Sequence, residues 1–83
     1  MVYLAIEPRA AIEAIRLAIE TGWIVLMGSD AITPEEQKRY SLSGVNLTRF
    51  SYPLANATSE IVADALETIE EHHPGEIVWV QHA

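Results

Sequence analysis

The chain contains no cysteine, and this absence excludes several kinds of chemistry at once. Disulfides, thiolate nucleophiles and cysteine-based zinc or iron–sulfur sites all need a residue that the sequence lacks. No window approaches the ~18 apolar residues that a membrane-spanning helix needs. The first residues, MVYLAIEPR, lack the basic and long apolar regions of a signal peptide. We therefore expect a soluble, cytoplasmic protein that does not enter a membrane.

Positive charge is missing from the second part of the chain. Residues 1–50 hold six acids and all five bases, whereas residues 51–83 hold six acids and no base, and the net charge is −7. Because phosphate recognition needs clustered Lys and Arg, direct binding to nucleic acid is disfavoured. A basic protein surface is the natural complement of this charge. The alternative is that the acidity keeps a small protein in solution and does nothing else.

Apolar residues, in contrast, are plentiful. The length of 83 residues predicts one domain, residues 1–83, with a single small core, and a hydrophobic content of 49% argues against disorder. Mainly apolar runs that favour strands lie at residues 2–6, 23–28 and 76–81, and alternating side chains favour a strand at residues 46–52. Helical periodicity or capping signals mark residues 8–21, 34–41 and 56–75. Gly22 stops the first helix, and Thr33 with Glu36 forms a capping box for the second.

The order of these elements is βαβ, a short helical insertion, and a second βαβ. The polar stripes of the two long helices, at positions 9, 13, 16, 20 and 60, 64, 67, 71, have identical spacing. The order fits the α+β, split βαβ, ferredoxin-like fold, in which two helices pack on one face of a four-stranded antiparallel sheet. A different placement of the third strand, or a three-layer arrangement, stays open.

The predicted strands are apolar on both faces, although two helices can cover one face at most. An apolar surface of more than a few hundred Å² usually marks an interface. The short insertion with Ile32, Tyr40 and Leu42 can cover part of the second face. We expect the rest to be covered by self-association or a partner protein, or to line a pocket. The residues that we assign to this face are Trp23, Val25, Met27 and Trp79.

The helix within residues 56–75 has the most uneven charge in the chain. Glu60, Asp64, Glu67 and Glu71 follow the spacing i, i+4, i+7, i+11 and form one stripe opposite the apolar side. Neighbouring carboxylates repel by roughly 0.2–0.5 kcal/mol per pair, so the stripe does not help the fold. At 1.5 Å per residue it is about 16 Å long and resembles a run of phosphates in spacing and sign. We predict that these four residues bind a partner.

Other motifs carry little chemistry. His72 and His73 are adjacent, and neighbours on a helix point about 100° apart, so they cannot share a metal ion as an i, i+4 pair does. The turn Gly28-Ser29-Asp30 lacks the further glycines of a phosphate-binding or dinucleotide-binding loop. The basic residues near the aromatic strand at 46–52 are too few to favour binding of single-stranded nucleic acid. We predict no metal site, no cofactor and no catalytic centre.

Our first hypothesis is a small acidic, non-catalytic protein-binding module that docks its acid-striped helix on a basic partner surface, such as that of a nucleic-acid-binding protein. Small acidic proteins of phage or mobile-element origin that inhibit nucleases as nucleic-acid mimics, including anti-CRISPR proteins, share this profile as a class, without an identifying motif. The alternative is a homodimeric ferredoxin-like domain, either a ligand-binding regulatory module or a small enzyme of the dimeric α+β barrel type. A subunit with an apolar interface in a larger complex is a third possibility.

Overall fold

The computed structural model describes residues 1–81, and strands and helices alternate along them. The strands are β1 (Val2–Ala5), β2 (Ile24–Met27), β3 (Leu47–Arg49) and β4 (Val78–Gln81). The helices are α1 (Ala11–Thr21), α2 (Pro34–Leu42) and α3 (Ser59–His72), and a short 3-10 turn, η1 (Pro8–Ala10), leads into α1. Each of these elements forms in a segment for which the sequence predicts one.

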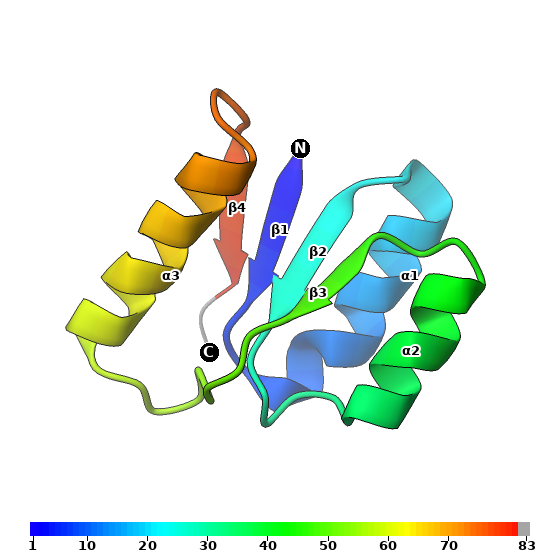
Figure 1. Ribbon diagram of the computed structural model, residues 1–83, viewed down its shortest axis with the longest axis horizontal. Coiled ribbons are helices and arrows are strands. Elements are labelled where there is room, and N and C mark those ends of the chain that lie inside the picture. Colours follow the sequence, from blue (N-terminus) through cyan, green and yellow to red (C-terminus); the bar gives the residue numbers. More distant parts are fainter. Residues whose placement is uncertain (82–83) are drawn as a thin grey trace.

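The sheet is parallel throughout, so the expected antiparallel ferredoxin-like sheet is wrong. The strand order is β3-β2-β1-β4, and each neighbouring pair is parallel. Figure 1 shows the four arrows pointing the same way. Parallel neighbours need a crossover connection, usually a helix. The segment that we expected to be a short helical insertion is such a crossover, because α2 connects β2 to β3.

Helices cover both faces of the sheet, and the expectation of two helices on one face is also wrong. α1 and α2 lie on one face, here called the α1 face, and α3 lies on the other, the α3 face (Figure 1). β1 is in the centre, and Val2, Leu4 and Ala5 have no exposed surface. This arrangement explains why the strands are apolar on both faces, since strands of parallel sheets are buried on both sides.

The core therefore has two layers, one on each side of the sheet. On the α1 face, the alanine-rich side of α1 packs on the strands, and the buried residues are Ala5, Ala11, Ala14, Ile15, Ala18, Val25, Met27, Ile32 and Leu47. On the α3 face the buried residues are Val2, Leu4, Ile6, Leu26, Phe50, Leu54, Ala65 and Ile69. None of the helices within residues 1–81 has the length and apolar composition of a membrane span.

The helix boundaries follow the capping signals in the sequence. The capping box before α2 is confirmed: the Glu36 backbone N–H donates to Thr33 Oγ1 at 3.1 Å, and Thr33 N–H donates to Glu36 Oε1 at 3.1 Å. These bonds to Thr33 lower the pKa of Glu36. Gly22 ends α1 with φ 75°, a conformation that costs glycine little. Thr58 caps α3 by accepting from Ile61 N–H at 3.3 Å.

Candidate functional site

The carboxyl ends of the strands are the first place to look for a site, because ligands of open parallel sheets bind there, where the strand order reverses. In this chain the order reverses beside β1, next to β4. The chain's own groups occupy that position: Gln81 Oε1 accepts from the N–H groups of Ile6 and Glu7 at 3.2 and 3.0 Å. Pro8, which follows, has no N–H. The donors that could bind a phosphate here are therefore used within the fold.

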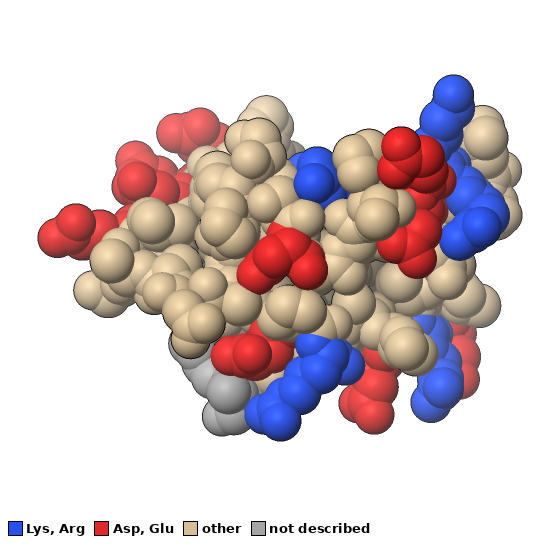
Figure 2. Space-filling view, turned by 90° about the horizontal axis from the view of Figure 1, so that it is seen from below, with Lys and Arg blue, Asp and Glu red and all other residues tan. Residues whose placement is uncertain are grey.

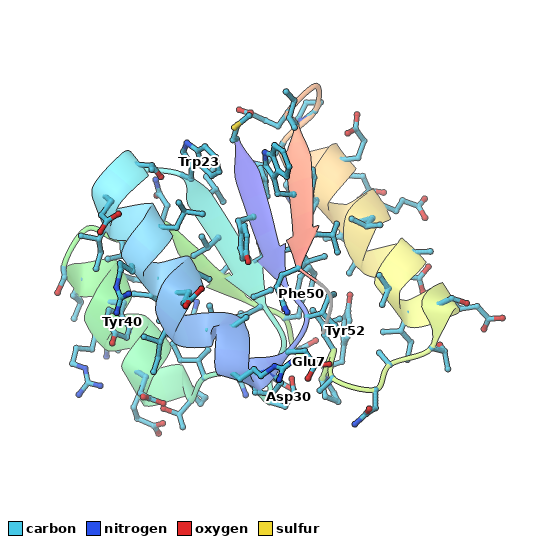
Figure 3. The ribbon with its side chains drawn as sticks, turned by 180° about the vertical axis from the view of Figure 1, so that it is seen from behind. Glu7, Trp23, Asp30, Tyr40, Phe50 and Tyr52 are labelled. Carbon is cyan, nitrogen blue, oxygen red and sulfur yellow. The ribbon has the colours of Figure 1, made fainter. Side chains whose placement is uncertain are left out.

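The turn after β2, Gly28-Ser29-Asp30, also serves the fold. Asp30 Oδ1 accepts from Leu54 N–H and Oδ2 from Ala55 N–H, both at 3.2 Å. A Cβ atom on Gly28 would lie 2.6 Å from the Leu54 nitrogen, so glycine is needed because the two segments approach closely. Figure 3 shows Asp30 and Glu7 at this end of the molecule. The turn joins the end of β2 to the segment after β3, and its geometry is explained without a ligand.

The basic residues do not form a common surface with the aromatic ones. Arg49 is half-buried and donates from Nε to Ile32 O at 2.8 Å and from Nη2 to Ser29 O at 3.0 Å. Arg39 lies on α2, 5.9 Å from the ring centre of Tyr40. In Figure 3, Tyr40 is on the α2 side, well apart from Phe50 and Tyr52. The residues that would bind single-stranded nucleic acid are therefore not brought together.

The four carboxylates of the predicted partner-binding stripe are brought together on α3, and we call them the acid stripe. Glu60, Asp64, Glu67 and Glu71 are all exposed. Within residues 1–81, an ion pair joins the Met1 ammonium group to Glu76 at 3.1 Å. No cation of these residues lies beside the acid stripe. Figure 2 shows red side chains projecting from the α3 side without blue neighbours, whereas red and blue alternate on the side of α1 and α2.

A groove lies beside α3, and sequence reasoning did not predict it. α3 packs near β1 and β4 and leaves β2 and β3 partly open on its face (Figure 1). The opening has a volume of about 550 Å³ and is lined by Leu26, Thr48, Arg49, Phe50, Ser51, Thr68, Ile69, His72 and His73. A second depression of about 360 Å³ continues it and shares Thr48 and His73. We call the two together the α3–β3 groove.

The floor of the α3–β3 groove is apolar, and one end of it is close to the acid stripe. Leu26, Phe50 and Ile69 are 4%, 7% and 1% exposed. The ring of Tyr52 lies 5.3 Å from that of Phe50 between centroids. Burial raises the pKa of Tyr52, and the negative charge of Asp64 raises it further. Asp64 therefore acts on a side chain next to the groove as well as facing solvent.

Of the four residues predicted for self-association, two are buried in the core and two are at least partly exposed. Tyr3 pairs with Val25 on one side and with Trp79 on the other, so these side chains share the α1 face. Val25 and Met27 are fully buried there. Trp79 is 53% exposed, and Trp23, before β2, is half-buried. Trp79 and part of Trp23 are thus at the surface, whereas Val25 and Met27 are in the core.

The remaining candidates give no further site. Among residues 1–81, no group of three or more His, Asp or Glu side chains is placed to hold a metal ion. His72 and His73 line the α3–β3 groove instead, and His73 lines both of its parts. The alternation of apolar residues along the strands predicted an uncovered apolar face. The groove could not be predicted in this way, because it depends on which strands α3 covers. No protein-family model, curated protein or solved structure matches this chain.

Proposed function

We propose that the chain is a non-catalytic protein-binding module that docks the acid stripe of α3 on a basic surface of a partner protein. The observation that carries the proposal is the exposure of four carboxylates on one helix with no cation beside them among residues 1–81. Neighbouring carboxylates at this spacing repel, so the stripe costs the isolated helix free energy. A basic partner surface removes that repulsion and gains attraction of opposite charges.

The length and sign of the acid stripe favour one class of partner. Eleven residue steps of 1.5 Å give a line of charge about 16 Å long, comparable with a short run of backbone phosphates. A surface that binds nucleic acid has cations at that spacing. The partner that we propose is therefore a nucleic-acid-binding protein, and the module would compete with nucleic acid for its basic surface.

Two variants with the same net charge test this proposal. One carries Glu60→Gln, Glu67→Gln and Glu71→Gln on α3, and the matched control carries Glu13→Gln, Glu20→Gln and Glu35→Gln, which are exposed residues of α1 and α2. The probe is a fluorescein-labelled oligolysine peptide, titrated at low and high salt. We expect the α3 variant to lose most of its affinity and salt dependence, and the control to keep most of both. Equal losses in the two variants would show that net charge alone binds the peptide, and the proposal would fail.

A second candidate function is self-association along β4. β4 is an edge strand, and an exposed apolar edge is a template for pairing with another chain. Trp79, within β4, is 53% exposed, and Ile77, just before it, is 59% exposed. The strand VWVQ contains no charged residue and no proline, which are the residues that usually prevent such pairing. Two copies of the chain could pair β4 with β4 and so cover Trp79 of each copy.

A further inference from the structure

We infer that the α3–β3 groove receives a basic amphipathic helix of the partner protein, an inference that rests on the proposed function. The groove lies over β2 and β3, the strands that α3 leaves open. Neighbouring strands are about 4.8 Å apart and a helix is about 10 Å wide, so two strands offer the width of one helix. A helix placed there would complete the helical layer on the α3 face.

The floor of the groove suits the apolar side of such a helix. Leu26 and Phe50 come from neighbouring strands and Ile69 from α3, and together they form a nearly buried apolar surface. Ile61, seven residues before Thr68 and therefore on the same line of α3, is 38% exposed. Helices bound in grooves insert side chains at i, i+3, i+4 and i+7. The dimensions and the lining of the groove match this mode of binding.

The charges beside the groove select a basic helix over an acidic or neutral one. At about 100° per residue, Asp64 and Glu71 lie about 40° and 60° around α3 from Thr68, on the side turned away from the sheet. They stand above the wall of the groove that Thr68 forms. On the opposite wall Val45 and Asn46 are uncharged, and the guanidinium of Arg49, which also lines the groove, is held by the carbonyl oxygens of Ile32 and Ser29. A helix in the groove would therefore meet carboxylates along one flank, and Lys or Arg on that flank would pair with them.

Synthetic peptides provide the probe for this inference. One alanine-based peptide has leucines at i, i+3, i+4 and i+7 and lysines along one neighbouring flank, and a second has the same composition in scrambled order. A third replaces each lysine by glutamate. We expect the full 83-residue chain to bind the first peptide at least about tenfold more tightly than the others, a difference of about 1.4 kcal/mol. Amide resonances of Leu26, Thr48 and Phe50 should shift on titration, with smaller shifts on α1 and α2.

Substitutions in and away from the groove locate the binding. Thr48 is exposed and lines both parts of the groove, and Thr48→Trp would fill it. Ala63, also exposed, lies about 140° around α3 from Thr68, so Ala63→Trp is the matched control on the other flank. We expect at least about a tenfold loss of affinity for the first variant and less than about a twofold change for the second. Thr68→Trp repeats the test from the helix side if Thr48→Trp does not fold.

The outcomes separate the inference from the proposed function. If the oligolysine peptide depends on the acid stripe, but the amphipathic and scrambled peptides bind equally and Thr48→Trp has no effect, the groove is not the site and the inference fails alone. Equal binding of the lysine and glutamate peptides would also overturn it. If oligolysine binding ignores the acid stripe, the proposed function fails and the inference fails with it. Selective, groove-dependent binding of the basic amphipathic helix supports both.

Discussion

Single residues at the carboxyl end of the sheet hold together segments that are distant in the sequence. Gln81 binds the backbone after β1, Asp30 binds the backbone at Leu54 and Ala55, and Arg49 binds the turn after β2. In many parallel sheets, polar groups at the carboxyl ends of the strands bind a ligand. Here the same kinds of residues satisfy the backbone of the chain itself, and they contribute to stability.

Gly28 gives the sharpest stability test at this scale. Gly28→Ala places a Cβ atom 2.6 Å from both the Leu54 nitrogen and Asp30 Oδ1, and Leu54 is fully buried. We expect the variant to lose about 1–3 kcal/mol of unfolding free energy through this overlap, measured by urea denaturation. The neighbouring Ser29→Ala should change stability by less than about 0.5 kcal/mol. A Gly28→Ala protein as stable as the wild type would contradict the close approach of the two segments.

Tyr52 reports the position of Asp64. Burial, and then the charge of Asp64, raise the pKa of Tyr52 above 10.0. Asp64→Asn should therefore lower this pKa toward 10.0 without reaching it, because burial is the larger cause, whereas Glu67→Gln should leave it unchanged. NMR titration of the tyrosine rings measures both. Since the folded pKa is raised, the neutral ring contributes stability below pH 10.0, and this contribution is lost as the pH rises through the folded value.

At the scale of elements, α1 and α3 have the same pattern of charge positions with opposite consequences. Glu67 has Asp64, Glu70 and Glu71 as its neighbours on α3, whereas Glu13 has Arg16 on α1 and Arg9 in the preceding turn η1. All of these residues are exposed, so the balance of charge distinguishes the two helices.

The same substitution should therefore have opposite signs on the two helices. Glu67→Gln removes three repulsions, from Asp64, Glu70 and Glu71, of roughly 0.2–0.5 kcal/mol each and should stabilise the protein. Glu13→Gln removes attraction and should destabilise it. Thermal unfolding at low salt measures the difference, and high salt should reduce it. Destabilisation by both variants would indicate that the carboxylate of Glu67 has a structural partner.

The sequence predicts the elements but not their direction. Capping by Thr33 and Glu36 and the stop at Gly22 are local effects, and both are found in the structure. Parallel and antiparallel strands have the same alternation of side chains, so the pattern of one strand cannot distinguish them. The signal was the apolar character of both faces, typical of a parallel sheet, together with a third crossover helix. Assigning residues 34–41 to an insertion, and the second face to a partner, led to the wrong sheet.

At the scale of the whole molecule, the two candidate binding surfaces lie on different faces of the sheet. The acid stripe and the α3–β3 groove are on the α3 face, whereas Trp79 is exposed on the α1 face. The groove, and which of the predicted apolar residues stay exposed, could not be located from the sequence, because both depend on which strands a helix covers. The acid stripe could be predicted, since its four residues belong to one helix and their spacing alone aligns them.

Self-association can be separated from partner binding by its response to salt. Pairing through β4 brings together two chains of net charge −7, so added salt should favour the dimer, whereas it should weaken binding to a basic partner. We expect light scattering to show a mass that rises with concentration and salt, and Trp79→Glu to restore the monomer. Ile12→Glu, at a residue of α1 that is 71% exposed, is the control and should leave the mass unchanged. A monomer under all conditions would exclude this second candidate.

Because β1 lies between β2 and β4, its pairing in the sheet is complete only after β4 has been synthesised. Val2 pairs with Val78 and Leu4 with Val80, so one edge of β1 has no neighbour until residues 78–81 have left the ribosome. The chain can form β1, α1, β2, α2 and β3 before then. Until β4 is present, however, α3 lacks one of the two strands near which it packs. Pairing β1 with β4 closes a loop that spans most of the chain, and such closure is slow. Until it occurs, the unpaired edge of β1 can pair with other chains. Chains interrupted before β4 should consequently depend on chaperones, even though most of their secondary structure can form.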